Sequence, residues 1–175
     1  SRFMSLLSRP SIMESSHADT EFSAFKVARR VNRENNIGVF YSRKSSVPLE
    51  YESSTEFRVL SKLENNPHVK RVKTQSLSIL CDNTLGRHYF PDIQILTVDN
   101  EIYIIEVKPL DDMLIPENIE KYSSLKDYCF TMGYGYAMID ERGNSFESIV
   151  NHYVSPEKER VILDALEEQK LLRYR

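Results

Sequence analysis

The most informative hydrophobic pattern is the apolar run over residues 102–107, which is typical of a buried β-strand. Side chains alternate along a strand, so Glu106 and Lys108 share a face with Ile102 and Ile104, about 6–7 Å apart. A carboxylate and an ammonium on a core face are unusual, because buried charges need a partner or a metal. This strand end therefore deserves a chemical explanation.

A second apolar run, residues 93–97, follows Asp92 and predicts the partner strand of a hairpin. A three-residue loop at 99–101 keeps the apolar side chains on one face, whereas a one-residue slip would turn them over. Asn100 tolerates the left-handed conformation that such a loop needs. The predicted register pairs Val98 with Ile102, Leu96 with Ile104, Gln94 with Glu106 and Asp92 with Lys108.

Helical periodicity and capping residues predict the surrounding elements. A helix over residues 19–35 begins at Asp19 or Thr20. The next begins at Ser53 or Ser54 and ends near residue 65, with Phe57, Leu60 and Leu63 toward the core and Val59 beside them. A long strand follows over residues 69–80, with a turn at 81–86.

After Lys108, Pro116 begins a helix at its first turn, and residues 136–139 form another strand. The apolar stripe of that helix comprises Ile119, Tyr122, Leu125, Cys129 and Met132. A helical crossover implies that the strands on either side of it are parallel. Residues 144–150 predict a short helix, and Ser155 and Pro156 open the last one.

These elements predict a mixed α/β (α+β) fold, with a central mixed sheet of about four to five strands flanked by helices. We expect a flexible N-terminal arm at 1–18 and one domain at 19–150. A C-terminal helix at 151–175 either packs on the domain or serves assembly.

The chain has 175 residues, a formal net charge of −3 and 41% hydrophobic residues, as in soluble globular proteins. No apolar stretch is long enough to cross a membrane, and no signal-peptide core is present. Two distant cysteines argue against a zinc ribbon or a disulfide framework and for a reducing compartment. We therefore expect a cytoplasmic protein.

Two carboxylates and a lysine at a hairpin end suit the binding of a divalent metal and a water molecule. Magnesium prefers oxygen ligands and retains some water. The alternative is a buried ion-pair network, although such networks seldom add much stability.

The motif Pro91-Asp92, a spacer and Glu106-Val107-Lys108 resembles that of PD-(D/E)xK nucleases. The preceding segments, with Glu56 on a helix, an Asn-Pro-x-Val turn at 66–69 and Gln75 on a strand, look like the approach to the active site in TnsA-like transposon-end endonucleases. The resemblance spans roughly residues 38–140. It implies a restriction-endonuclease-like core that hydrolyses DNA phosphodiester bonds.

The resemblance also implies roles for individual residues. Asp92, Glu106 and the Val107 carbonyl would bind Mg²⁺, for which Mn²⁺ would substitute, and Lys108 would position the attacking hydroxide. Glu56 would be a third carboxylate that binds a second metal or acts through water. Two alternatives stay open: Glu56 favours the helix dipole only, or Glu52 takes its place.

Because the net charge is slightly negative, contacts with double-stranded DNA must come from local basic patches. A basic helix face and the segments around it supply candidates, although a solvated surface explains the helix face equally well. The candidates are Lys26, Arg29, Arg30, Arg33, Arg43, Lys44, Lys70, Lys73 and Gln75.

The TnsA resemblance implies cutting at transposon ends beside a partner transposase. A stand-alone phage, repair or restriction-type nuclease of the same fold is the closest alternative. A second class is a catalytically silent DNA-binding or assembly protein. Cutting both strands would require two sites, as in a homodimer, or sequential nicking.

Overall fold

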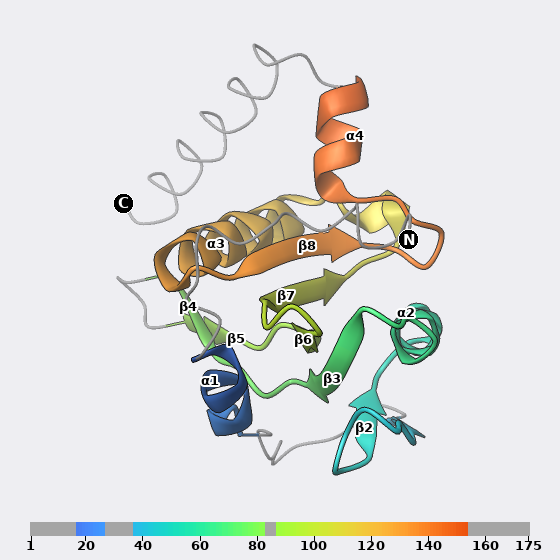
Figure 1. The fold of residues 1–175 in the computed structure, drawn as a ribbon. Coiled ribbons are helices and arrows are strands. Elements are labelled where there is room, and N and C mark those ends of the chain that lie inside the picture. Colours follow the sequence, from blue (N-terminus) through green and yellow to red (C-terminus); the bar gives the residue numbers. More distant parts are fainter. Residues whose placement is uncertain (1–16, 27–36, 83–86, 154–175) are drawn as a thin grey trace.

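The centre of the fold is a four-stranded sheet in the order β3-β6-β7-β8, shown in Figure 1. The structure is a computed structural model that describes residues 17–26, 37–82 and 87–153. The strands are β3 (Val69–Thr74), β6 (Ile93–Thr97), β7 (Ile102–Val107) and β8 (Gly135–Ile139). The first two pairings are antiparallel and β7 runs parallel to β8. A mixed central sheet and its parallel crossover are thus confirmed.

Helices cover both faces of this sheet (Figure 1). Tyr103, Ile105 and Val107 pack in the same core as α2 (Ser54–Glu64). Ile102 and Ile104 pack in the opposite core, with residues of α1 (Ala18–Ala24) and α3 (Pro116–Met132). The predicted division of β7 into two faces is therefore confirmed. None of the described helices is long and apolar enough to cross a membrane.

The hairpin between β6 and β7 has the predicted loop length but a different register. Gln94 pairs with Ile104 and Leu96 with Ile102, so the predicted register is wrong by two residues. The loop comprises residues 98–100, and Asn100 has a φ of 58°. The left-handed residue of a three-residue loop stands last, which moves the loop back by one position. A shift of two residues preserves the faces.

Helix α2 begins and ends as predicted, with Ser53 as its N-cap, but its buried face differs. The Ser53 hydroxyl accepts a hydrogen bond of 3.1 Å from the Glu56 N–H. Val59 is fully buried, whereas Phe57 is 41% exposed, so the prediction that Phe57 faces the core is wrong. Glu56 takes the inward position instead, and Phe57 packs beside a small sheet of β1 (Gly38–Phe40) and β2 (Leu49–Tyr51).

The predicted strand over residues 69–80 is interrupted. Gln75 has a φ of 47°, which ends β3 at Thr74 because left-handed backbone cannot continue a strand. The chain resumes as β4 (Ile79–Asp82), which pairs with β5 (Arg87–Tyr89) in a separate two-stranded sheet. Ser76 at the break donates hydrogen bonds to the buried Gln94 side chain from its N–H and hydroxyl.

Helix α1 is shorter than predicted and has no side-chain cap at His17, so neither Asp19 nor Thr20 begins it. It ends because Phe25 is extended, with φ −63° and ψ 119°. The Lys73 ammonium donates to the carbonyls of Phe22, Ser23 and Phe25, which satisfies this helix end. Residues 27–35 of the predicted helix lie outside the described residues.

The C-terminal half follows the sequence pattern closely. Helix α3 begins at Pro116 and ends at Gly133, which has a φ of 75°. Its predicted stripe is buried except for Met132, which is 41% exposed because it lies in the last turn. A 3₁₀ turn (Leu110–Asp112) precedes it, and α4 (Phe146–Tyr153) begins two residues later than predicted. Of the flexible arm predicted at 1–18, residues 1–16 lie outside the described ranges, and the prediction is wrong for Ala18, which is buried in α1. Of the C-terminal helix predicted at 151–175, residues 151–153 belong to α4 and residues 154–175 lie outside the described ranges.

Replacing Lys73 with methionine should destabilise the protein by about 1–3 kcal/mol, because three carbonyls at the end of α1 lose a charged donor. Urea denaturation measures this change. Lys70→Met is the matched control, since Lys70 lies on the same strand but is exposed, and its contact within the described part of the chain is an ion pair of 3.7 Å with Asp19. Its cost should stay within about 0.5 kcal/mol. Equal costs for both variants would refute the anchoring role of Lys73.

Candidate active site

The ends of β6 and β7 bring Asp92, Glu106 and Lys108 together, as the sequence predicts. Asp92 directly precedes β6, and its Oδ2 accepts a hydrogen bond of 2.8 Å from the Val107 N–H. Extending the observed register by one pair places Asp92 opposite Glu106 rather than opposite Lys108. The two carboxylates are therefore cross-strand neighbours on the face that α3 covers.

Glu106 is the least satisfied group of the site. It is 3% exposed, and its Oε1 lies 3.7 Å from the Lys108 Nζ, which is an ion pair but too long for a hydrogen bond. Its Oε2 is buried and has no hydrogen-bond partner among the described residues. An unsatisfied buried carboxylate oxygen is costly, so this atom is a place where a ligand would be stabilised.

The pKa values of Asp92 and Glu106 are both raised, which indicates an excess of negative charge in the site. Loss of water around the Asp92 carboxylate, then the charges of Glu106 and Glu56, raise the pKa of Asp92 well above its usual value. Burial also raises the pKa of Glu106, although the charges of Lys108 and Lys121 oppose that shift. A bound cation would relieve this repulsion.

Glu56 stands at the border of the site and already has local partners. Its Oε2 accepts from the Glu52 N–H at 3.0 Å, and its Oε1 accepts from the Ser53 hydroxyl at 3.3 Å. This resembles a capping box, except that the Glu56 carboxylate accepts from the N–H of Glu52 rather than from that of the N-cap residue Ser53, so Glu56 has a local structural role at the start of α2. The influence of Glu56 on the pKa of Asp92 and Glu106 also puts it within electrostatic range of both.

The ligands available for a metal are two carboxylates and one carbonyl. Within the described residues, no three His, Cys, Asp or Glu side chains gather closely enough to hold an ion. Asp92 and Glu106 provide oxygens, and the Val107 carbonyl points to the same side of β7 as its N–H, toward Asp92. Such a set leaves positions for water, which is how magnesium is usually bound.

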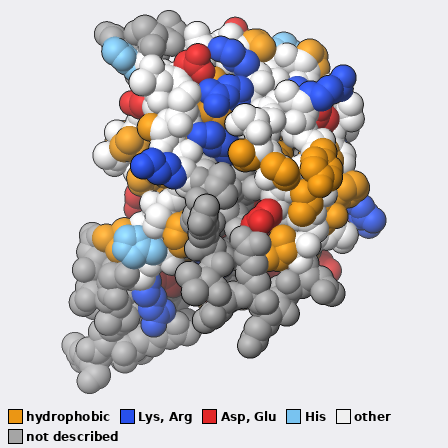
Figure 2. All heavy atoms as spheres, turned by 90° about the horizontal axis from the view of Figure 1, so that it is seen from below, with side chains coloured by type: hydrophobic (Ala, Val, Ile, Leu, Met, Phe, Trp, Pro, Cys, Tyr) orange, Lys and Arg blue, Asp and Glu red, His pale blue; other side chains and the backbone are white. Residues whose placement is uncertain are grey.

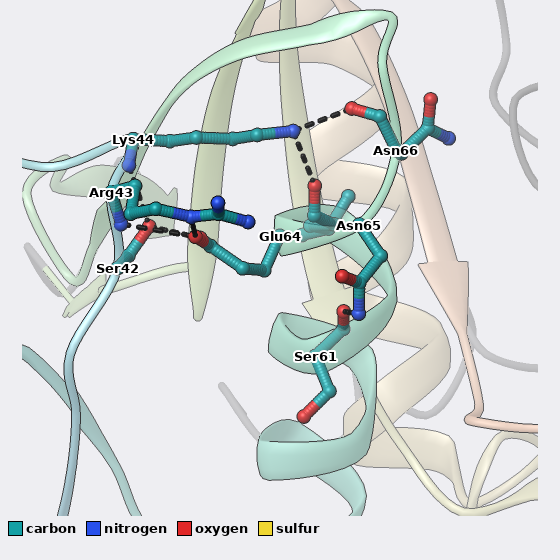
Figure 3. A network of polar contacts seen from close by, with 8 residues as sticks. Ser42, Arg43, Lys44, Ser61, Glu64, Asn65 and Asn66 are labelled. Carbon is teal, nitrogen blue, oxygen red and sulfur yellow. Dashed lines mark hydrogen bonds and ion pairs between the residues drawn. The ribbon is translucent and has the colours of Figure 1, made fainter.

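Two of the basic residues predicted to contact DNA serve the fold instead. The Lys44 ammonium donates to the carbonyls of Leu63 and Asn66 at the end of α2, as Figure 3 shows. Lys73 satisfies the end of α1 in the same way. Backbone carbonyls bind both ammonium groups, so the fold alone accounts for where these two side chains lie.

The other predicted DNA contacts are scattered. Arg43 pairs with Glu64 at 3.2 Å while its side chain remains 87% exposed (Figure 3). Lys26 and Lys70 are exposed. Gln75 is 5% exposed, and its N–H donates to the Asp92 carbonyl, so it supports the site through its backbone. Arg29, Arg30 and Arg33 lie outside the described residues.

Glu106→Gln should stabilise the metal-free protein by about 1 kcal/mol at pH 8, because it removes a poorly compensated buried charge. The folded-state pKa of Glu106 is raised, so its cost is absent below about pH 4 and appears as pH rises through the folded pKa. The stability gain of the variant should therefore grow with pH. Urea denaturation in a chelator at pH 4, 6 and 8 measures it.

Glu64→Gln is the matched control with the opposite sign. Burial opposes ionisation of Glu64, but hydrogen bonds from Ser42 and Arg43 outweigh it and lower the pKa. The stability that this carboxylate contributes is present at neutral pH and is lost as pH falls through the lowered pKa. Glu64→Gln should cost about 1 kcal/mol at pH 8. Destabilisation by Glu106→Gln at that pH would contradict the strained-site interpretation.

Comparison with models of known protein families finds no match for this chain, and comparison with curated proteins finds no significant match. The resemblance to PD-(D/E)xK nucleases therefore rests on the sequence motif alone.

Proposed function

We propose that this protein is a metal-dependent endonuclease that hydrolyses phosphodiester bonds in double-stranded DNA, with Mg²⁺ as its cofactor and Mn²⁺ as a substitute. One observation carries the proposal: the buried Glu106 Oε2 lacks a partner among the described residues, opposite Asp92 and beside Lys108. A carboxylate left in that state favours a bound cation.

The alternative, a purely structural ion-pair network, fits these contacts poorly. A stabilising buried pair needs close geometry and further hydrogen bonds on the remaining oxygens. Here the Lys108–Glu106 separation is 3.7 Å, and a second buried carboxylate stands opposite Glu106. We therefore expect the cluster to weaken the metal-free fold rather than stabilise it, which favours a role in chemistry.

Each side chain has a specific task in the proposed reaction. Asp92 and Glu106, with the Val107 carbonyl, would hold the ion, and Glu56 would act through water because the start of α2 already occupies its oxygens. When bound, Mg²⁺ lowers the pKa of water and offsets charge on the phosphoryl oxygens. Lys108 would orient the attacking water in line with the leaving oxygen and stabilise its negative charge as the proton departs.

The backbone of Lys108 is held firmly enough for that task. Its N–H donates to the Ile139 carbonyl on β8 at 3.0 Å, while its side chain stays 26% exposed. The ammonium can therefore reach a substrate from a fixed base. This combination of a rigid main chain and an accessible amine suits a positioning group.

The order of Glu56, Asp92, Glu106 and Lys108 along the chain supports a TnsA-like activity at transposon ends beside a transposase. A stand-alone nuclease of the same fold would use the same site. Cutting of both strands would then come from a homodimer or from successive nicks.

Incubation with supercoiled plasmid tests the activity directly. The wild-type protein should nick or linearise it with Mg²⁺ or Mn²⁺ and not in EDTA. Asp92→Asn and Lys108→Met should each lower the rate by about 100-fold or more, since each removes a group that acts in the transition state. Asp127→Asn, the same chemical change on the exposed surface of α3, should cut normally.

A protein that does not cut by itself is tested by metal binding. Titration with Mn²⁺, followed by electron paramagnetic resonance, should show one site that Asp92→Asn and Glu106→Gln both abolish. Absence of both cleavage and this metal site would refute the proposal. Metal binding without cleavage would indicate an enzyme that needs a partner.

A further inference from the structure

A surface hollow lies where β2 meets the start of α2. Its volume is about 490 Å³, which is within the range of small-ligand sites. Its lining combines aromatic, polar and charged side chains: Tyr51, Glu52, Ser53, Ser54, Phe57 and Arg58. The sequence analysis missed this hollow because it placed Phe57 in the core.

Aromatic rings form the apolar wall of the hollow. The centroid of the Phe57 ring lies 5.3 Å from that of Tyr51, in a tilted contact, and 5.7 Å from that of Phe40, in an edge-to-face contact. These neighbours hold Phe57 in place while it stays 41% exposed. Figure 2 shows hydrophobic side chains gathered on the side of the molecule where β1, β2 and α2 lie. Exposed, fixed aromatic rings are platforms on which nucleic-acid bases stack.

Glu56 connects the hollow to the candidate active site. Glu52, in the lining, donates its N–H to the Glu56 carboxylate, and Ser53 donates its hydroxyl to the same group. Glu56 in turn acts electrostatically on Asp92 and Glu106. The hollow is thus lined by the residues on either side of Glu56 at the start of α2, and Glu56 is within electrostatic range of both carboxylates of the candidate site.

We propose that this hollow receives an unpaired nucleobase of the DNA next to the phosphate that is cut, so that the protein prefers DNA with a bulge, flap or frayed end. This inference rests on the proposed nuclease function and specifies its substrate. The base must be unpaired, because stacking inside a duplex hides both of its faces. Phe57 and Tyr51 would contact a face, and the Ser54 hydroxyl would serve the base edge.

Arg58 at the rim adds a cation suited to the neighbouring phosphate. Its side chain is 60% exposed, and one N–H of its guanidinium pairs with Glu141 at 3.3 Å. A guanidinium has five N–H donors, so this contact leaves others for a phosphate. The core of a protein–protein interface is usually depleted of charge. Serine is among the residue types depleted at such interfaces, whereas arginine is enriched, so it is Ser53 and Ser54 in the lining that favour a nucleotide over a protein partner.

The test is equilibrium binding in EDTA, which prevents cleavage, to two fluorescent duplexes that differ only by one bulged nucleotide. The wild-type protein should bind the bulged duplex at least about fivefold more tightly, as expected for one base stacked on an aromatic ring. Phe57→Leu, which keeps apolar volume but removes the ring, should abolish this preference. Phe130→Leu is the matched control, since Phe130 is 78% exposed on α3, and it should keep the preference.

Thermal denaturation establishes that Phe57→Leu is folded, and Tyr51→Leu provides a second variant if it is not. Equal wild-type affinity for the two duplexes, or a preference that survives both substitutions, would overturn the inference. Self-association that Phe57→Leu abolishes, without any bulge preference, would instead assign the hollow to a second copy of the chain. Plasmid cleavage and Mn²⁺ binding are scored separately. Cutting without bulge preference refutes only this inference, and bulge preference with neither cutting nor the metal site refutes only the nuclease.

Discussion

The hydrogen bond from the Val107 N–H to Asp92 Oδ2 is the interaction on which the candidate site depends. It replaces a backbone pairing with a side-chain acceptor at the point where β6 and β7 separate. Asp92 thereby stays beside the sheet and opposite Glu106, although the negative charges of the two carboxylates repel each other. The regular pairing of Ile93 with Ile105, one residue away, holds the arrangement in place.

Apolar burial along β7 compensates for this repulsion between buried carboxylates. Large apolar side chains on both faces of β7 are fully buried, and they offset the cost of one poorly satisfied carboxylate at the strand end. Several charged groups elsewhere in the described structure form close hydrogen bonds. Lys44 and Lys73 each satisfy the carbonyls of a helix end, and Asp140 accepts three hydrogen bonds from Arg142 and Asn144. Among the described residues, the buried side-chain oxygen without a hydrogen bond is therefore that of Glu106, in the sequence motif at the end of β7.

Local patterns predicted the elements whose signals are local. The faces of β7 follow from alternation, the start of α2 from Ser53, and the start of α3 from Pro116. The errors arose where tertiary contacts decide. Gln75 turns left-handed where the chain leaves the sheet, and Phe57 turns outward because Phe40 and Tyr51, from another sheet, receive it. The internal roles of Lys44 and Lys73 likewise depend on helix ends distant in sequence, which no periodicity reveals.

The parallel pairing of β7 with β8 has a consequence for the order in which the site forms. Asp92 and Glu106 belong to a hairpin with a three-residue loop, and hairpins close within microseconds. Lys108 is fixed through the Ile139 carbonyl, on a strand that arrives only after the whole α3 crossover has folded back. Contacts between such distant segments form late, because closing the loop costs entropy first. The folding chain would hold Asp92 and Glu106 together well before the backbone of Lys108 is fixed on β8. The complete arrangement of the three side chains therefore exists only in the finished fold.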